Sequence, residues 1–175
     1  MTKKHGLCFV SLLVLLAGCT PPGLAPEKES AVTPGTVAGA EFSIPNLANP
    51  SQQLSLASYK GQVVLLDFWA TWCPPCRSEL PALNQLYNDL KENGFVIVGM
   101  TVDNGPAEKV AEAVRRFELS YPVGLAGEDV QQAYGGIRAV PTKFLLDKKG
   151  AVAKQYEGVV PEKQLRADIE TLLAL

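Results

Sequence analysis

Two cysteines, Cys73 and Cys76, are separated by two prolines in the run Trp-Cys-Pro-Pro-Cys. The apolar, β-branched run at 63–66 before them predicts a buried strand, and leucines spaced three or four apart after them predict a helix. The first turn of a helix offers unpaired N–H groups and the positive end of the macrodipole, which favour a thiolate over a thiol. Because the thiolate is the nucleophile in disulfide exchange, we expect Cys73 to attack and Cys76 to resolve the mixed disulfide.

Two other interpretations of this cysteine pair are weaker. A zinc site needs four ligands, and the other candidate ligands of this kind, Cys8, Cys19 and His5, all lie within the first 19 residues. A purely structural disulfide between residues three apart would close a very short loop, which gives little entropic stabilisation. We therefore predict a redox-active pair with no metal and no other cofactor.

The run Asp-Phe-Trp-Ala-Thr-Trp-Cys-Pro-Pro-Cys from Asp67 to Cys76 resembles the thioredoxin superfamily. The proline pair is similar to that of its membrane-tethered, extracytoplasmic branch, the TlpA/ResA-like thiol–disulfide oxidoreductases, and the similarity covers residues 40–175. The resemblance implies an α/β, thioredoxin-like three-layer fold. It has a mixed central sheet with helices on both faces, an N-terminal β-hairpin and a central helix–strand insertion.

The pattern of apolar residues places these elements along the chain. Alternation at 41–44 and 53–56 predicts the N-terminal hairpin, which we expect to cover one edge of the sheet. Pro81 falls inside the helix after the cysteines, which we expect to end at Asn93-Gly94. The remaining predicted elements are a strand at 95–102, a helix capped near Asn104 with Pro106 at its start, a strand at 122–125, a helix at 128–134, a hairpin of strands 143–147 and 151–156, and a helix from Pro161.

A second segment of the site runs from Tyr134 to Thr142 and ends in Val-Pro-Thr. It resembles the thioredoxin loop that ends in a cis-proline beside the two cysteines. The resemblance implies that Pro141 keeps metal away from the thiols and that the backbone of Val140 pairs with a substrate peptide. Trp72 and Thr142 complete the predicted substrate-binding residues. The alternative is an ordinary trans proline at the start of a strand.

Two acidic residues are candidate proton acceptors for Cys76. Asp67 ends an apolar strand, so burial should raise its pKa and suit it to general-base catalysis. Thioredoxins have a buried aspartate at the matching position, and Glu79 matches a second carboxylate near the thiols of ResA-like proteins. Asp67 could instead be solvated at the strand end, and Glu79 could simply complement the helix dipole.

The N-terminus predicts export and lipidation. Lys3 and Lys4 precede an apolar stretch at 7–17 that is too short for a stable membrane span. The following Leu-Ala-Gly-Cys, ending at Cys19, resembles a bacterial lipobox; an ordinary secretory signal or an uncleaved anchor are the alternatives. The predicted organisation is a signal peptide at 1–18, a lipidated Cys19 with a flexible tether at 19–39, and a thioredoxin-like domain at 40–175.

Charge narrows the range of partners. The chain has 16 basic and 18 acidic side chains and contains no basic cluster, which excludes nucleic acid as an expected partner. A lipid on Cys19 would be its contact with a membrane.

Together these features predict a lipid-anchored protein-disulfide reductase outside the cytoplasm, facing the periplasm if the cell is Gram-negative. We expect disulfide-containing proteins as substrates, with apocytochrome c as one candidate, and a membrane thiol as electron donor. A disulfide oxidase or isomerase of the same fold and a non-enzymatic tethered binding lipoprotein are the alternatives. A copper-handling protein of the Sco type would need C-x-x-x-C, which differs from the spacing of Cys73 and Cys76.

Overall fold

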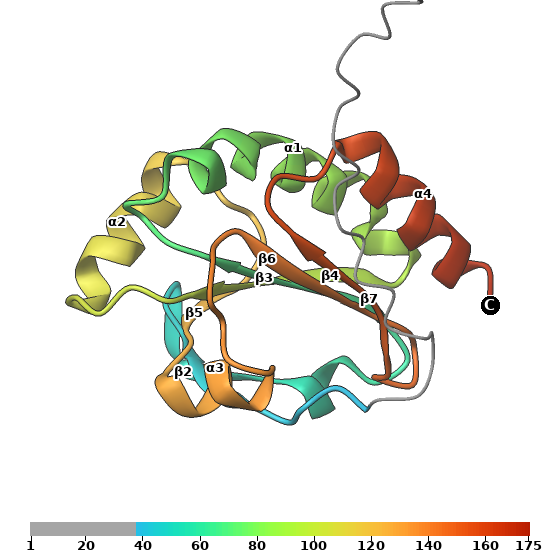
Figure 1. The fold of residues 1–175 in the computed structure, drawn as a ribbon, viewed down its shortest axis with the longest axis horizontal. Coiled ribbons are helices and arrows are strands. Elements are labelled where there is room, and N and C mark those ends of the chain that lie inside the picture. Colours follow the sequence, from blue (N-terminus) through green and yellow to red (C-terminus); the bar gives the residue numbers. More distant parts are fainter. Residues whose placement is uncertain (1–37) are drawn as a thin grey trace, which may run out of the picture.

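The computed structural model describes residues 38–175, which form a five-stranded mixed sheet covered by helices (Figure 1). The strand order is β5-β4-β3-β6-β7, with β3, β4 and β5 parallel and with β6 and β7 antiparallel to their neighbours. This arrangement confirms the predicted α/β fold with a mixed central sheet. The strands are β3 (Val63–Trp69), β4 (Phe95–Thr101), β5 (Val123–Leu125), β6 (Thr142–Leu146) and β7 (Val152–Glu157).

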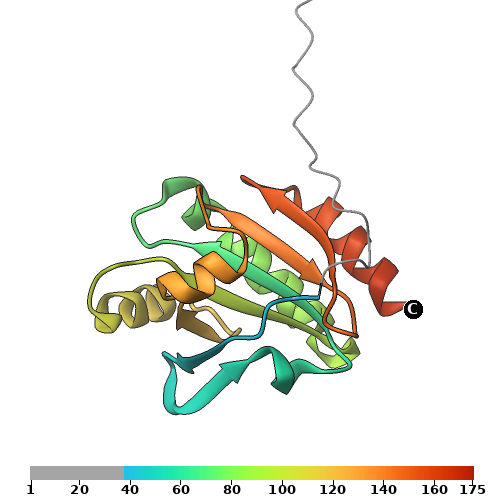
Figure 2. The same cartoon turned by 60° about the horizontal axis from the view of Figure 1, so that its bottom comes forward.

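Helices lie on both faces of the sheet, so the fold has three layers (Figures 1 and 2). One apolar core packs under α1, α2 and α4, and a second lies between the sheet, α3 and the N-terminal hairpin. All residues of the central strands β3, β4 and β6 are buried, as expected for strands covered on both faces. The helices are α1 (Pro74–Leu90), α2 (Ala107–Arg116), α3 (Glu128–Ala133) and α4 (Glu162–Leu173).

Alternation along the strands decides which side chains reach the layer of α1 and α4. Successive residues of a strand point to opposite faces. On β3, Leu65 and Trp69 pack in the core beneath these helices, while Leu66 and Phe68 pack in the other core. Asp67 lies between Leu65 and Trp69 in this alternation, so it faces α1. Lys143 is the partner of Asp67 in the β3–β6 register and faces the same layer.

The N-terminal hairpin pairs β1 (Ser43–Asn46) with β2 (Asn49–Ser55) and lies beside the edge strand β5 (Figure 2). The amide of Leu47, in the turn of the hairpin, donates a hydrogen bond of 2.8 Å to the carbonyl oxygen of Val123. A Cβ on Gly124 would lie 2.6 Å from the Ile44 side chain and 2.9 Å from the backbone carbonyl oxygen of Pro45, so this close approach requires glycine. The predicted covering of a sheet edge is therefore confirmed.

The predicted start of one helix is wrong, and the predicted end of another is right only in part. We expected a cap near Asn104, but α2 begins at Ala107, Pro106 occupies the N-cap position, and no side chain caps the helix. The helix α1 continues through Pro81 and ends at Leu90. A 3₁₀ turn over Lys91–Asn93 follows it, and Gly94, at a φ of 89°, then turns the chain toward β4. Proline sets its own backbone angle at the first end, and a tighter turn replaces the last α-helical turn at the second.

The signal peptide and Cys19 lie in residues 1–37, outside the described residues, and stay predictions. Contact with the domain begins slightly before the predicted boundary at residue 40. Ala38 pairs with Ala151, and the Gly39 amide donates to the Gly150 carbonyl oxygen at 2.8 Å. Within residues 38–175, no helix combines the length and apolar character needed to cross a lipid bilayer.

Candidate active site

The two cysteines form a disulfide at the start of α1. Cys73 is the N-cap of the helix, Pro74 begins it, and Cys76 lies in the first turn. The amide of Cys76 donates a hydrogen bond of 3.2 Å to the Cys73 sulfur. The Cys73 and Cys76 residues are 3% and 1% exposed. An amide donor at a helix N-terminus favours negative charge on the Cys73 sulfur once the disulfide is reduced.

The loop before β6 lies directly against this disulfide. The Val140–Pro141 peptide bond is cis, as the resemblance implied. The Val140 carbonyl oxygen lies 3.7 Å from the Cys73 sulfur. Thr142 is buried, and its hydroxyl donates a 2.8 Å hydrogen bond to the carbonyl oxygen of Ala139. Of the predicted substrate-binding residues in this loop, Val140 and Pro141 therefore border the disulfide, whereas the Thr142 side chain points into the loop itself.

Apolar side chains are exposed around the disulfide. Trp72, immediately before Cys73, is 65% exposed, and Val159 is 46% exposed. Val159 follows Gly158, whose amide donates a 2.8 Å hydrogen bond to the Pro141 carbonyl oxygen. Large exposed apolar side chains beside a reactive group are typical of a surface that binds another protein. Trp69, by contrast, is fully buried in the core.

The structure brings the two predicted carboxylates together around a lysine. The Lys143 Nζ lies 2.7 Å from Glu79 Oε1 and 3.5 Å from Asp67 Oδ1. All three residues are buried, with Lys143 0%, Asp67 1% and Glu79 6% exposed. The alternatives of a solvated Asp67 and a Glu79 that only complements the helix dipole are therefore wrong. Both acids belong to one buried charged cluster beneath the start of α1.

Burial controls the ionisation of these acids. It raises the pKa of Glu79 to about 7, against the opposing effect of the Lys143 ammonium group. Burial likewise raises the pKa of Asp67, and Lys143 again opposes the rise. The pKa of the buried Tyr121 phenol lies well above its ordinary value because of burial and of the two nearby carboxylates, so this hydroxyl stays protonated. A carboxyl group with a pKa near 7 suits general acid–base chemistry at neutral pH.

Sequence reasoning missed Lys143 as a residue of the site. We predicted only that it begins a strand. The signal was available, since a lysine in a strand covered on both faces is almost never buried without a counter-charge. What the sequence did not provide was the register of β6 against β3, which places Lys143 opposite Asp67.

Asp103 is a second missed residue, and it holds the loop that precedes the cysteines. Its carboxylate accepts hydrogen bonds from the Thr71 amide at 2.9 Å and from the Thr71 hydroxyl at 2.6 Å. The Thr101 hydroxyl donates a third, at 2.8 Å. The sequence signal for this role was an aspartate directly after an apolar strand. The carboxyl ends of neighbouring parallel strands meet at one edge of a sheet, so such an aspartate lies close to the loop that follows the next strand. Asp103 thereby fixes the backbone next to Trp72.

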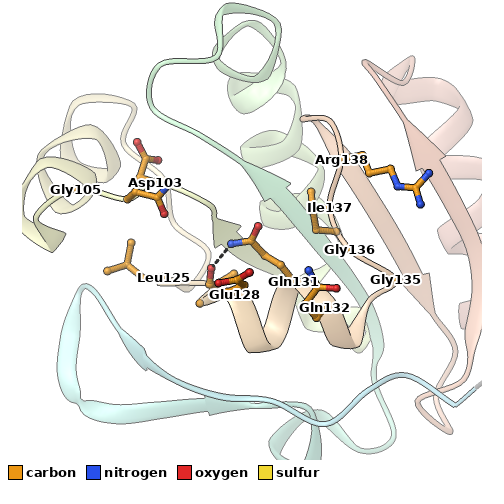
Figure 3. Close-up of a pocket in the computed structure, with 13 residues that line it drawn as sticks. Asp103, Gly105, Leu125, Glu128, Gln131, Gln132, Gly135, Gly136, Ile137 and Arg138 are labelled. Carbon is orange, nitrogen blue, oxygen red and sulfur yellow. Dashed lines mark hydrogen bonds between the residues drawn. The ribbon is translucent and has the colours of Figure 1, made fainter.

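A polar cavity of about 850 Å³ lies beside the cis-proline loop (Figure 3). Asp103 borders one side, Gln131 and Gln132 of α3 border another, and the segment 135–138 leads from its wall toward Val140. The Gln131 side chain donates a 2.8 Å hydrogen bond to the carbonyl oxygen of Ala126. The cysteines do not line this cavity. It is therefore a neighbour of the reactive site and not part of it.

Comparison with known proteins agrees with this geometry. The sequence matches the Redoxin family over residues 33–173. It is 34% identical over 168 residues to "Thiol-disulfide oxidoreductase ResA" of Bacillus cereus, covering 93% of this chain and 94% of that protein. A thioredoxin-family thiol:disulfide interchange protein of Chlorobium tepidum has a similar structure, with a TM-score of 0.72 and 30% identity, over 82% of this chain and 99% of that one. A secreted thiol-disulfide isomerase of Corynebacterium glutamicum superposes with a TM-score of 0.73 at 25% identity, covering 78% and 85% of the two chains.

Proposed function

The chain belongs to the Redoxin family and is a thiol–disulfide oxidoreductase of the ResA type, and on this premise we propose that it is a protein-disulfide reductase. The observation that carries the proposal is the Cys73–Cys76 disulfide at the start of α1, together with a buried cluster of two carboxyl groups that includes Glu79 of the same helix. A carboxylate that accepts the proton of Cys76 helps the enzyme's own disulfide to form. Formation of that disulfide is the half-reaction by which a reductase gives two electrons to its substrate.

The proposed cycle begins with the reduced cysteines. The Cys73 thiolate attacks one sulfur of a substrate disulfide, and the other substrate sulfur leaves with the electron pair of the broken bond and takes up a proton. Cys76 then gives its proton to a carboxylate of the buried cluster and attacks the Cys73 sulfur. The second substrate sulfur leaves as a thiolate, the Cys73–Cys76 disulfide closes, and a membrane thiol donor returns two electrons to the enzyme.

We assign substrate contact to the rim of the disulfide. The exposed indole of Trp72 provides an apolar surface, and the backbone of Val140 beside Pro141 can pair with an extended peptide. Thr142 contributes through its hydrogen bond to Ala139, which supports the shape of the loop. Extended segments of unfolded proteins, such as an apocytochrome c before haem attachment, fit this description.

The direction of electron transfer is testable. Reduced protein should reduce insulin, and its potential should lie nearer to the roughly −270 mV of thioredoxin than to the roughly −120 mV of a strong oxidase. The reason is that the negative charge of the buried carboxylates disfavours a thiolate on Cys76, so the reduced enzyme lacks the thiolate stabilisation that makes a strong oxidase oxidising. Equilibration with glutathione measures the potential. A value near the oxidase end, with rapid oxidation of reduced substrates, would support the oxidase alternative instead.

Lipid anchoring outside the cytoplasm is part of the proposal and rests on the Leu-Ala-Gly-Cys sequence that ends at Cys19. Cys19→Ser should release the protein from the membrane fraction or leave it unprocessed, since the lipid supplies the membrane affinity. Fractionation of cells and the mass of the mature N-terminus are the measurements, with Cys8→Ser as the matched control. A Cys19→Ser protein that is fully processed and still bound to membranes would contradict the anchor.

A further inference from the structure

Lys143 is a fully buried lysine whose charge the proposed cycle does not yet use. Its ammonium nitrogen contacts Glu79 at 2.7 Å and Asp67 at 3.5 Å. The three side chains come from three elements, since Asp67 is on β3, Glu79 on α1 and Lys143 on β6. A buried lysine is costly unless it is paired, so an arrangement that retains one beside reactive thiols calls for a chemical explanation.

The charges of the cluster favour one proton on the two carboxyl groups. With both acids ionised, the cluster carries a net charge of −1, and a single proton brings it to zero. A second proton would leave the Lys143 ammonium buried without an anionic partner. Because a buried net charge is costly, the neutral, singly protonated arrangement is the most stable. In this arrangement one of the two carboxyl groups is ionised and can act as a base.

The other titratable groups around the cluster do not disturb this balance. The phenol of Tyr121 stays protonated beside the two acids. Tyr156 is the neighbour of Lys143 in the β6–β7 register, and its hydroxyl donates a 2.8 Å hydrogen bond to Asp168. Asp168 is in turn paired with Lys154 at 2.7 Å. Cys73 and Cys76 are joined to each other in this structure.

We propose that Lys143 is a positioning residue for the thiol chemistry, because its ammonium group keeps one carboxylate of the Asp67–Glu79 pair ionised at neutral pH and ready to take the proton of Cys76. The inference rests on the proposed reductase cycle. When Cys76 transfers its proton to that carboxylate, the thiolate becomes the cluster's negative charge and Lys143 balances it. The thiolate then displaces the substrate sulfur from Cys73, as described above.

Glu79 is the acid that the geometry points to as the acceptor. It makes the shorter contact with Lys143. It lies three residues after Cys76 on α1, a spacing that puts both side chains on one face of the helix. It is also the more exposed acid, at 6% against 1% for Asp67, so it can return its proton to solvent more readily. Asp67, deeper in the cluster, holds the single proton.

The test is single-turnover reaction of the reduced protein with the aromatic disulfide DTNB. The first release of thionitrobenzoate reports attack by Cys73, and the second reports resolution by Cys76. For Lys143→Met, we expect the first phase to be unchanged. The second phase should slow about tenfold at pH 7, and the midpoint of its pH profile should rise by about one unit or more, because loss of a nearby positive charge disfavours the ionised carboxylate. Lys149→Met, an exposed position in the turn of the same hairpin, is the matched control.

A purely structural role of Lys143 would give a different result. It would slow the second phase equally at every pH, without moving the midpoint, and that outcome would overturn the inference. The double variant Lys143→Met/Glu79→Gln removes one charge of each sign and keeps the site neutral if the single variant folds poorly. It should resolve no more slowly than Glu79→Gln alone, since Lys143 acts through Glu79. Additive losses would also contradict the inference, whereas a wild-type protein without a second phase would contradict the reductase proposal itself.

Discussion

Cys73→Ser is expected to abolish disulfide reduction, and Cys76→Ser to stop the reaction at the mixed disulfide. Without the Cys73 sulfur there is no nucleophile at the helix N-cap, so turnover of insulin should fall by at least about 10³-fold. Without Cys76, attack can proceed but nothing inside the protein displaces the bound substrate. Non-reducing electrophoresis and intact mass should show a covalent adduct with Cys76→Ser that is absent with Cys73→Ser.

The asymmetry between the two cysteines follows from their places on α1. Cys73 borders the exposed Trp72 and the Val140 carbonyl oxygen, and it receives the amide hydrogen bond from Cys76. Cys76 lies within the first turn of α1, where it is 1% exposed and packs in the core beneath the helix. Added dithiothreitol should release the substrate from the Cys76→Ser adduct, which controls for irreversible damage. An adduct that forms instead through Cys76 in the Cys73→Ser protein would reverse the assigned roles.

Local patterns in the sequence were enough to predict most of the fold. The apolar run of β3 and the leucine periodicity of α1 are each encoded by a few neighbouring residues, and both elements begin where they were predicted, although β3 continues to Trp69 and α1 ends at Leu90. The start of α2 was not found where it was predicted. Asn104 and Pro106 are both residue types that commonly begin a helix, and Pro106 occupies the N-cap position. Such ends depend on backbone angles that composition alone does not fix.

In the site, too, some residues could be predicted from short motifs, whereas others depend on contacts between distant parts of the chain. Cys73, Cys76 and Pro141 belong to short motifs, so their positions could be predicted from a resemblance. Lys143 becomes part of the site only through the pairing of β6 with β3, which joins residues far apart in the chain. Asp103 likewise acts through its contact with Thr71 across two strand ends. Contacts of this kind depend on register, and register is visible only in the folded protein.

The structure also changes which carboxylate we expect to matter more for resolution. The sequence favoured Asp67 by its place at a strand end, whereas Glu79 makes the closer contact with Lys143 and shares a helix face with Cys76. Glu79→Gln should slow the second phase of the DTNB reaction about 10²-fold, and Asp67→Asn about tenfold, within the usual range for a general base and a supporting group. A larger loss for Asp67→Asn would return the role of base to that residue.

The same Glu79→Gln variant should change how folding stability depends on pH. Burial raises the pKa of Glu79 from 4.5 to about 7, so between these values the unfolded chain releases a proton that the folded protein still holds. A raised carboxyl pKa therefore lowers the free energy of unfolding as pH rises through this window, and the loss persists above it. Urea denaturation of the wild-type protein should show this decline, and Glu79→Gln should flatten it. Removing the contact with Lys143 should also lower the free energy of unfolding, but by the same amount at every pH.

Glu92→Gln, an exposed position just after α1, is the control and should keep the wild-type slope. An unchanged slope in Glu79→Gln would mean that folding does not raise the pKa of Glu79, so Glu79 would lack the near-neutral pKa expected of the proton acceptor for Cys76.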